Sequence, residues 1–425
     1  MLSYEENELL THVGPGTPMG NLLRRFWIPA ILSSELPRPD CDPVRVRILG
    51  ENYVAFRDTS GRVGFLDECC PHRGASLALG RCEEGGLRCI YHGWKFAIDG
   101  TILETPNLRD NAIFKTKVKA LAFPCEEAAE IVWVYLGPVD KQPPLPNYPF
   151  MNAAPAHFAP NRITLDTNWV QVMEGHHDSS HAGILHSDYS PFRAGVRPEL
   201  VQLLRGGADF TSDDNAPRIE IEDTEFGFHE GSVRRTQVDG KEMGYARVHA
   251  HVTPFLNLVP PMGHAFEVPI DDHHTSLVGV TYDPLHTVDR GARLTAVEDQ
   301  RYYESNHFLG TPENRWLQDR STMDTSFSGI GDFAAEDWAV TNSMGPIIDR
   351  TKEHLVPTDV AVIRLRRLLL GAARDLEEGI EPPVLHADLS TVQSGDGLIE
   401  LGTPWQQLVP GNKPSLDRSQ RHERV

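Results

Sequence analysis

Two short segments of the sequence each place one cysteine beside one histidine. One residue separates Cys70 from His72, two residues separate Cys89 from His92, and sixteen residues lie between the two pairs. Two loops that each present a thiolate and an imidazole can enclose a metal cluster from two sides. A structural zinc site is one interpretation, because Cys69 and His72 also form a C-x-x-H pair that matches Cys89 and His92. The unequal loops instead favour a [2Fe–2S] centre, with two cysteines on one iron and two histidines on the other.

A second group of possible metal ligands lies in residues 174–186. Asp178 and His181 are three residues apart, so on a helix they share one face. His186 follows five residues later, so the helix must end or distort before both imidazoles can bind one metal. Gly183 makes such an ending plausible. Two histidines and one distant carboxylate would form a facial triad that leaves coordination positions open for dioxygen.

Other ligand sets fit the same residues. His177 and His181 are four residues apart and form an equally good pair by spacing, as in zinc hydrolases, although Asp178 stands where a glutamate would be expected. A third ligand must come from far downstream, and either Glu336 or Asp337 could complete a triad there. A solvated helix face is the alternative interpretation for each acid in this region. The acids of residues 332–349 are Asp332, Glu336, Asp337 and Asp349.

Composition limits the possible classes of function. The 425 residues include 60 Asp and Glu against 40 Lys and Arg, and this net charge of −20 disfavours binding to nucleic acid or an anionic membrane. No stretch reaches the ~18–20 apolar residues of a membrane span, and the acidic start lacks the features of a signal peptide. Six cysteines are too few for a disulfide scaffold. We therefore expect a cytoplasmic protein of two domains.

The elements that must position these side chains indicate an α+β protein. Strands are predicted at 44–50, 53–58, 63–68, 96–100, 131–137, 245–259 and 275–283. One helix is expected to start near Asp166 or Thr167, and a second, amphipathic helix to span 358–376. We expect Val360, Ile363, Leu368 and Leu369 of that second helix in the core, and its arginines on a solvated face.

These elements predict five segments along the chain. They are an N-terminal helical segment and subunit contact at 1–40, an antiparallel β domain at 41–137, a proline-rich linker at 138–150, an α+β domain at 151–410 and a polar tail at 411–425. The run from Gly14 to Gly20 lacks the G-x-G-x-x-G spacing, so we expect no NAD or flavin site in this chain.

The segments CPHRGASL and CIYHGWKF resemble the Rieske signature of ring-hydroxylating oxygenases, and the Asp-x-x-His-x4-His run resembles the iron motif of the same family. The resemblance implies that Cys70, His72, Cys89 and His92 bind the [2Fe–2S] cluster. It selects His181, His186 and Asp337 as ligands of a mononuclear Fe(II). It implies that Asp178 bridges His181 to the Rieske residue His92 of a neighbouring subunit, and that the catalytic domain has a helix-grip, START-like fold.

The segments GPGTPMGNLLRRFW and MGPIIDRT look like the phthalate dioxygenase branch of that family. This implies a homo-oligomer, trimeric or hexameric, that uses O2 and receives electrons from NADH through a reductase with FMN and a [2Fe–2S] centre. An aromatic carboxylate is the implied substrate class, of the phthalate, isophthalate, chlorobenzoate or phenoxybenzoate type. Arg247 is the first candidate to bind that carboxylate, and Arg218 and Arg234 are weaker ones.

Two other functions remain open from the sequence. The same residues could perform O- or N-demethylation as a monooxygenase. A chain with these metal motifs could also be an electron carrier or a zinc-binding protein without oxygenase activity. The histidines at 249 and 251 depart from the branch, so a substrate other than phthalate itself is plausible.

Overall fold

The computed structural model describes residues 1–109, 112–189, 211, 213–260, 263–288, 290 and 300–410. The chain forms two compact units. The larger unit comprises Met1–His12, Pro146–Glu267 and Asp272–Val425, and the smaller unit comprises Val13–Leu145 and Val268–Asp271. The division after Leu145 lies within the proline-rich residues 138–150, while the domain boundaries stay a prediction. The expected tail, 411–425, lies outside the described residues.

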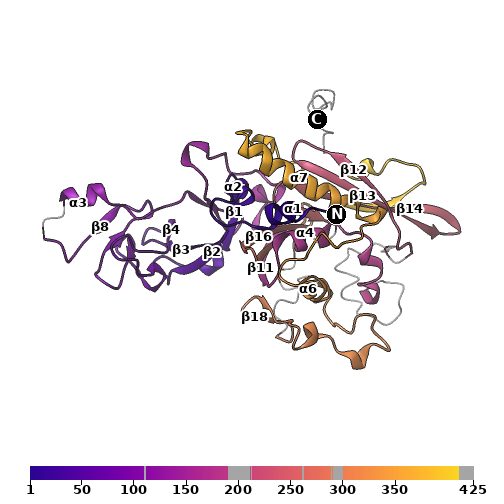
Figure 1. Ribbon diagram of the computed structural model, residues 1–425, viewed down its shortest axis with the longest axis horizontal. Helices are drawn as coiled ribbons and strands as arrows, with labels where there is room; N and C mark the ends of the chain where they lie inside the picture. Colours follow the sequence, from indigo (N-terminus) through magenta and orange to yellow (C-terminus); the bar gives the residue numbers. More distant parts are fainter. Residues whose placement is uncertain are drawn as a thin grey trace. The chain divides into compact units, whose positions relative to one another are not determined.

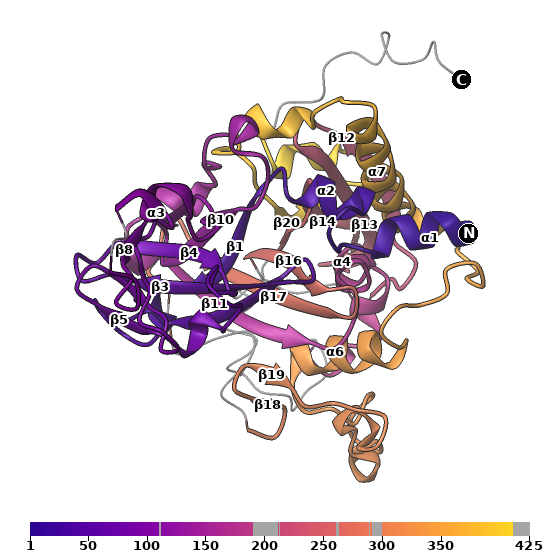
Figure 2. The same ribbon diagram turned by 60° about the vertical axis from the view of Figure 1, so that its left-hand side comes forward.

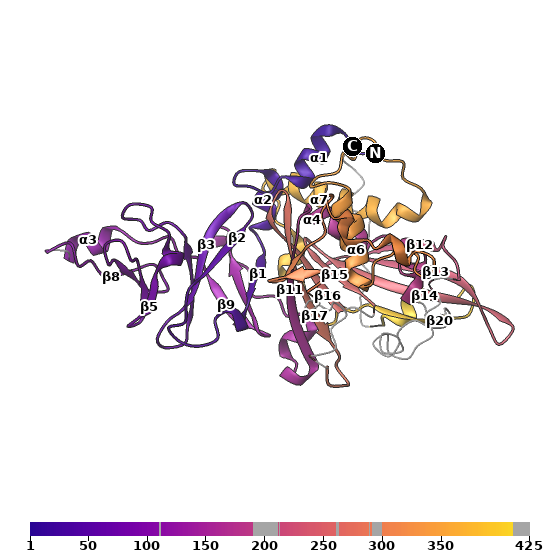
Figure 3. The ribbon, with the colours of Figure 1, turned by 90° about the horizontal axis from the view of Figure 1, so that it is seen from below.

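The smaller unit consists of three antiparallel sheets, with the strand orders β1-β10-β9, β2-β3-β4 and β5-β6-β7-β8. Its strands are β1 (Trp27–Leu32), β2 (Val44–Ile48), β3 (Glu51–Arg57), β4 (Val63–Asp67), β5 (Arg81–Glu83), β6 (Gly86–Arg88), β7 (Lys95–Phe96), β8 (Ile102–Glu104), β9 (Cys125–Ala128) and β10 (Ile131–Tyr135). Its helices are α2 (Pro18–Leu23) and α3 (Ala112–Lys117). Within this unit, α3 lies at the same end as β8 (Figure 3).

Four of the five strands predicted for this unit coincide with β2, β3, β4 and β10. The fifth, predicted at 96–100, ends at Phe96 because the chain turns there. Gly100 closes the turn with φ +78°, and a Cβ at this position would lie 2.0 Å from the carbonyl oxygen of Ala120. Only glycine fits such a close backbone approach. The strands β1, β5, β6, β8 and β9 were not predicted. The runs of three residues in β5, β6 and β8 are too short to show a period.

The larger unit is built on one ten-stranded sheet. The strand order is β12-β13-β14-β15-β16-β17-β11-β19-β18, and β20 pairs with β14. Neighbours pair antiparallel from β12 to β16 and between β11 and β17, whereas β11 and β19 pair parallel. The strands are β11 (Phe158–Leu165), β12 (Arg218–Asp223), β13 (Gly227–Val238), β14 (Lys241–Val252), β15 (Leu256–Val259), β16 (Gly263–Asp271), β17 (His274–Tyr282), β18 (Tyr303–Glu304), β19 (His307–Phe308) and β20 (Gly395–Ile399).

Helices cover this sheet, in agreement with the predicted α+β class. They are α1 (Tyr4–Thr11), α4 (Trp169–His176), α6 (Phe333–Ser343) and α7 (Val360–Glu377). α7 runs along β12, and α4 packs against β15 and β17 (Figures 1 and 2). Buried Val172 of α4 and Trp338 of α6 share one apolar cluster with Leu165 of β11. No helix in the described part of the chain is long and apolar enough to cross a membrane.

The helix predicted at 358–376 is confirmed as α7, but its buried face differs from the expected one. Leu369 is buried as predicted, whereas Val360 is exposed. Arg366, expected on a solvated face, is buried at 3% exposure. The reason is that its guanidinium is paired on both sides, which a hydropathy pattern does not reveal.

The pairing of Arg366 belongs to a buried ion cluster between α4, α7 and the residues after α6. Arg366 bonds Glu174 at 2.6 Å and Glu353 at 2.6 and 2.8 Å. Arg350, fully buried, bonds both carboxylate oxygens of Glu174 at 3.0 and 2.9 Å. Burial alone would raise the pKa of Glu174, but the two arginines lower it. Its ionised form therefore stabilises the fold above the unfolded-state pKa, and this contribution is lost as pH falls through the folded-state pKa.

Replacing Glu174 with alanine should destabilise the larger unit strongly. The change leaves Arg350 without its carboxylate partner in a buried position, which typically costs about 3–5 kcal/mol. Urea unfolding followed by circular dichroism measures the effect. The matched control is Asp349→Ala, which removes the carboxylate of the exposed Asp349–Lys352 pair and should leave the unfolding midpoint nearly unchanged. Equal midpoints for the two variants would contradict this role of Glu174.

Candidate metal centres

The two cysteine–histidine pairs lie on two loops of the smaller unit with the same backbone pattern. The amide of Cys70 donates to the carbonyl of Ala75, and that of Cys89 donates to the carbonyl of Trp94, both at 2.8 Å. In each loop, the glycine four residues after the cysteine donates back to the cysteine carbonyl, at 2.8 Å for Gly74 and 3.0 Å for Gly93. Both glycines have positive φ, +73° and +76°. Glycine is the residue that adopts this conformation freely.

The loops bring all four predicted cluster ligands into one region. Cys70 and Cys89 are buried in the same apolar cluster, and the ring centroids of His72 and His92 are 4.5 Å apart. Burial raises the pKa of the Cys70 thiol to about 11, so the thiolate that binds iron needs a cation beside it. The buried Nδ1 of His92 has no hydrogen-bond partner among the described residues. Two buried thiols beside two imidazoles fit a [2Fe–2S] centre with mixed ligands.

The second group of ligands comes from the C-terminal side of α4 and from α6. α4 begins with Asn168 as its N-cap rather than Asp166 or Thr167, and it ends at His176, before Asp178. A short 3-10 turn, His181–Gly183, follows. Gly183 is required there, because a Cβ would lie 2.4 Å from the carbonyl oxygen of Thr211. The helix thus ends earlier than the sequence indicated, and a turn carries His181 and His186.

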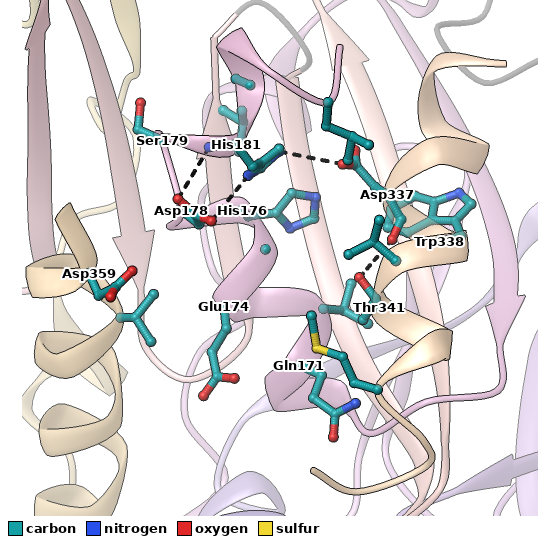
Figure 4. Close-up of a pocket in the computed structure, with 18 of the residues that line it drawn as sticks. Gln171, Glu174, His176, Asp178, Ser179, His181, Asp337, Trp338, Thr341 and Asp359 are labelled. Atoms are coloured by element: carbon teal, nitrogen blue, oxygen red, sulfur yellow. Dashed lines mark hydrogen bonds and ion pairs between the residues drawn. The ribbon is translucent and has the colours of Figure 1, made fainter. Parts of the chain in front are cut away.

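This turn and α6 place three predicted iron ligands around one point. His181, His186 and Asp337 each offer one ligand atom, and these atoms lie within 4.8 Å of one another. Oδ1 of Asp337 is 2.9 Å from Nε2 of His186. The same oxygen is 3.4 Å from Nε2 of His181, a contact that Figure 4 shows as a dashed line. Ligands bound about 2.0–2.2 Å from a metal at near 90–110° to one another lie roughly 3–3.5 Å apart. The three side chains therefore fit a facial triad.

Each of these two histidines has a carboxylate at its other ring nitrogen. Nδ1 of His186 is 2.7 Å from Oε2 of Glu336, which is fully buried and also accepts a hydrogen bond from Ser328. Nδ1 of His181 is 3.6 Å from Oδ2 of Asp178. Carboxylates behind metal-binding histidines fix the ring orientation and the tautomer. The geometry thus separates two neighbouring acids, with Asp337 in the ligand group and Glu336 behind His186.

The charges of this group depend strongly on one another. Burial alone would raise the pKa of Asp337, but His186 and His181 hold it well below its usual range. Burial alone would lower the pKa of His181, whereas its contacts with Asp178 and Asp337 raise it to about 10. The carboxylates therefore attract positive charge into the space between the ring nitrogens. An iron cation held by these residues would supply that charge with both imidazoles neutral.

His177, the alternative partner of His181 by spacing, lies elsewhere. It forms a separate, fully buried group with Glu230 and His249, whose ligand-type atoms lie within 4.8 Å of one another. Glu230 and His249 were not among the predicted site residues. One sequence feature could have pointed to His249. Side chains two residues apart on a strand lie on the same face, so His249 shares a face of β14 with the predicted Arg247.

A cavity of about 300 Å³ adjoins the His181, His186 and Asp337 group, and its lining includes Arg247 and His249. Arg247 donates to the carbonyl of Pro260 at 2.6 Å. The other two predicted arginines do not line this cavity. Arg218 is exposed at the start of β12 and is paired with Glu220 at 3.0 Å. Arg234 is fully buried and bonds Ser179 and Thr211.

Comparisons with known proteins show the family to which the chain belongs. A model of the Rieske [2Fe-2S] domain matches residues 26–122, and a model described as LigXa C-terminal domain like matches residues 134–419. The phthalate 4,5-dioxygenase oxygenase subunit of Pseudomonas putida is 36% identical over 89% of this chain and 88% of its own length. The chain belongs to the Rieske oxygenases. Another Rieske oxygenase subunit, that of 3-chlorobenzoate-3,4-dioxygenase from Comamonas testosteroni, is 37% identical over 96% of this chain and 97% of its own.

This Rieske oxygenase subunit also shares its fold with solved members of the family. The crystal structure of dicamba monooxygenase bound to dicamba superimposes with a TM-score of 0.56 at 17% identity, over 84% of this chain and 99% of that one. The protein is an oxidoreductase, the oxygenase subunit of a Rieske dioxygenase. Its cofactors are a Rieske [2Fe–2S] cluster and a mononuclear iron, and dioxygen is its co-substrate. The predicted family, fold class and cofactors are confirmed.

The variant Glu336→Gln should bind iron more weakly in the catalytic unit. It removes the charge behind His186 and keeps the side-chain size, and the loss of such a partner typically lowers metal affinity about 10- to 100-fold. Iron retained after dialysis against a graded chelator measures the change, and the visible absorption of the [2Fe–2S] cluster should stay at the wild-type level. The control is Asp332→Asn, because asparagine also caps a helix such as α6. Equal iron retention in both variants would argue against this role of Glu336.

Proposed function

We propose that this Rieske oxygenase subunit oxygenates an aromatic carboxylate. The observation that supports this proposal is that one cavity is lined both by the His181, His186 and Asp337 group and by Arg247. A guanidinium binds a carboxylate through two parallel hydrogen bonds. The relatives named for phthalate and 3-chlorobenzoate act, by their names, on aromatic acids.

We assign the [2Fe–2S] cluster to Cys70, His72, Cys89 and His92. We assign the mononuclear iron to His181, His186 and Asp337, whose arrangement fits a facial triad. When bound, such an iron supplies the open coordination positions at which dioxygen is activated. The residues around it position the reactants: Glu336 orients His186, Arg247 holds the substrate carboxylate, and the apolar ring of Phe333 stacks on His186 at 4.0 Å.

The carboxylate of Asp178 is proposed to link His181 to a Rieske histidine, His92, on a neighbouring subunit. Asp178 bonds Ser180 and lies near His181, and its side chain is 33% exposed, so one side of it is accessible to a second subunit. Although burial raises its pKa, the contacts with His181 and Ser180 lower the pKa of Asp178 to about 2. It is therefore ionised at neutral pH and can accept hydrogen bonds from two imidazoles.

The variant Asp178→Asn should keep both metals and lose most of its turnover. Asparagine keeps the size of the side chain but removes the charge that both imidazoles would share. Metal analysis and the [2Fe–2S] absorption check that the centres are intact, and single-turnover reoxidation of the reduced cluster checks electron transfer. The control is Asp359→Asn, which removes a carboxylate from the same cavity wall (Figure 4) without touching His181. Wild-type turnover in Asp178→Asn would rule out the bridge.

The variant Arg247→Ala should weaken the binding of aromatic carboxylates about 10- to 150-fold, the range expected for a charge-assisted hydrogen bond worth about 1.5–3 kcal/mol. Anaerobic calorimetry with benzoate and 3-chlorobenzoate measures the dissociation constants, with iron and cluster content as a check on folding. Arg218→Ala is the matched control, because Arg218 lies outside the cavity. Unchanged affinity in Arg247→Ala would remove the main support for a carboxylate substrate.

We also propose an electron donor, an assembly and a type of oxygenation. We infer an NADH-dependent reductase with FMN and a [2Fe–2S] centre as the electron donor, and a homotrimer or hexamer as the assembly. The cytoplasmic location stays a prediction. O- or N-demethylation is the second candidate reaction, because a relative from Sphingobium sp., 30% identical over 91% of this chain, is named the oxygenase subunit of 5,5'-dehydrodivanillate O-demethylase. Analysis of products formed with isotopically labelled dioxygen separates it from dihydroxylation.

A further inference from the structure

The cavity beside the iron group contains one histidine to which no role has been given so far. Among the described residues, the histidines that line this cavity are His176, His181, His186 and His249. His181 and His186 are assigned to the iron. Nδ1 of His249 is 2.9 Å from the carbonyl oxygen of His176, and its Nε2 is fully buried. His176 is therefore the lining histidine with a ring nitrogen still available to the cavity.

One ring nitrogen of His176, at the end of α4, is bound to a carboxylate. Nδ1 of His176 is 2.5 Å from Oε1 of Glu267, a fully buried residue of β16. The other carboxylate oxygen, Oε2, accepts a hydrogen bond from the side-chain amide of Asn257 at 3.0 Å. Both oxygens of Glu267 are thus held in place. A carboxylate behind Nδ1 orients an imidazole and stabilises its protonated form.

The second ring nitrogen of His176, Nε2, faces away from Glu267. Within the described part of the chain it has no hydrogen-bond partner, and it is not one of the fully buried polar atoms that lack a partner. The side chain is 8% exposed and lines the cavity. Figure 4 shows the ring of His176 between α4 and α6, and the ring of Trp338 meets it edge to face at 6.4 Å. Nε2 can therefore contact water or a reactant in the cavity.

The reaction of an oxygenase consumes protons in this cavity. Adding both atoms of dioxygen to an aromatic ring as two hydroxyl groups takes up two electrons and two protons, and a monooxygenation that also forms water takes up the same. The electrons pass through the [2Fe–2S] cluster, whereas the protons must come from groups or water beside the reactants. Histidine is the side chain whose charge changes near neutral pH, and it is the commonest general acid in enzymes.

We propose that His176, backed by Glu267, gives one of these two protons to the oxygen that is reduced in the cavity. The N–H bond at Nε2 breaks and an O–H bond forms, and the ring is left neutral with its other proton on Nδ1, facing Glu267. Water then returns a proton to Nε2 before the next turnover. His176 is a catalytic residue in this scheme and Glu267 is a positioning residue. The inference holds for any bound aromatic acid, so it does not depend on the proposed substrate class.

Single-turnover reoxidation tests the role of His176. The reduced holoenzyme is mixed with dioxygen in the presence of 3-chlorobenzoate, and the returning absorption of the oxidised [2Fe–2S] cluster gives the rate. His176→Gln can still bond Glu267 but cannot deliver a proton, so its reoxidation should be slower by about tenfold or more, since a general acid typically contributes about 10²- to 10⁴-fold. The assay reads His176 even where 3-chlorobenzoate is not oxygenated, because forming hydrogen peroxide from dioxygen takes up the same two electrons and two protons.

Chemical rescue separates a proton donor from a structural side chain. His176→Ala leaves room for a small molecule, so added imidazole should restore much of the reoxidation rate, and the rate should vary with the pKa of substituted imidazoles. Glu267→Gln keeps the ring of His176 and removes the charge behind it, so it should slow reoxidation without being rescued by imidazole. The matched control is His251→Gln, because His251 is buried and bonds Asn257 at 2.8 Å but does not line the cavity. Its rate should equal that of the wild type.

The accessibility of Nε2 can be measured without turnover. Diethyl pyrocarbonate acylates accessible imidazole nitrogens, and mass spectrometry of the treated wild-type holoenzyme locates the modified residues. His176 should be modified and His249 should not. An unmodified His176 under conditions that modify the exposed His354 would contradict the inference.

Several outcomes would overturn the inference while leaving the proposed function intact. Wild-type reoxidation in His176→Gln would show that the ring delivers no proton. Slow reoxidation of His176→Ala that imidazole does not restore, or an equal loss in His251→Gln, would show that the side chain acts only through the buried hydrogen bonds. If His176→Ala does not fold, as judged by its [2Fe–2S] absorption, the solvent deuterium isotope effect on reoxidation decides. It should be larger in His176→Gln than in the wild type, because proton transfer then limits the rate, and an unchanged effect would refute the assignment. Failure of 3-chlorobenzoate to bind the wild type would instead count against the proposed substrate class alone.

Discussion

The hydrogen bond between Glu336 and His186 sets the geometry on which the catalytic unit depends. It joins a fully buried carboxylate to one nitrogen of an imidazole, so the other nitrogen has a single direction left. Adjacent residues of a helix point about 100° apart, and α6 uses this difference to send Glu336 behind the ring and Asp337 to its front. Glu336 and Asp337 can do so only while α6 is held in place, which the packing of Trp338 against Val172 and Leu165 achieves. The geometry of the metal-binding residues therefore depends on the apolar core that holds α6.

The distribution of buried charge follows from the same constraint. The catalytic unit gathers many carboxylates around its cavity, and an acidic chain with a net charge of −20 has few cations to spare. Arg350 and Arg366 neutralise Glu174 and Glu353, and in doing so they fix α4 relative to α7. Because Arg366 is paired in this way, Arg247 is the lining arginine, among the described residues, that we propose for an anionic substrate.

The sequence predicted well those features that depend only on residues close together in the chain. The two cysteine–histidine loops need only a few consecutive residues and a glycine with positive φ, so their spacing identified them. The roles of residues that depend on packing against distant parts of the chain were harder to predict. By residue type Glu336 and Asp337 are equivalent, and the resemblance favoured Asp337. The placement of α6 gives the physical reason, because it puts Asp337 beside both histidines and Glu336 behind His186. α4 was expected to extend beyond Asp178 because its pattern stays helical in tone, but the chain turns there, and close packing at Gly183 leaves no room for a side chain.

Buried polar residues were the hardest to interpret from the sequence, and they explain how the iron-binding turn is held. Arg234 was considered as a substrate ligand, yet it is fully buried and bonds Ser179, within the segment that joins α4 to His181. The same segment is tied at its start, where Nε2 of His177 donates to Asn257 at 2.7 Å and Asn257 donates to Glu267 at 3.0 Å.

These bonds run across the inner face of the sheet, from β13 through β15 to β16, and each would be costly to bury unsatisfied. These hydrogen bonds hold the irregular turn that carries His181 and His186 against the sheet. The strand that contributes Arg247 and His249 belongs to that sheet. The substrate wall and the iron-binding turn are therefore held by the same sheet, the turn through hydrogen bonds to it.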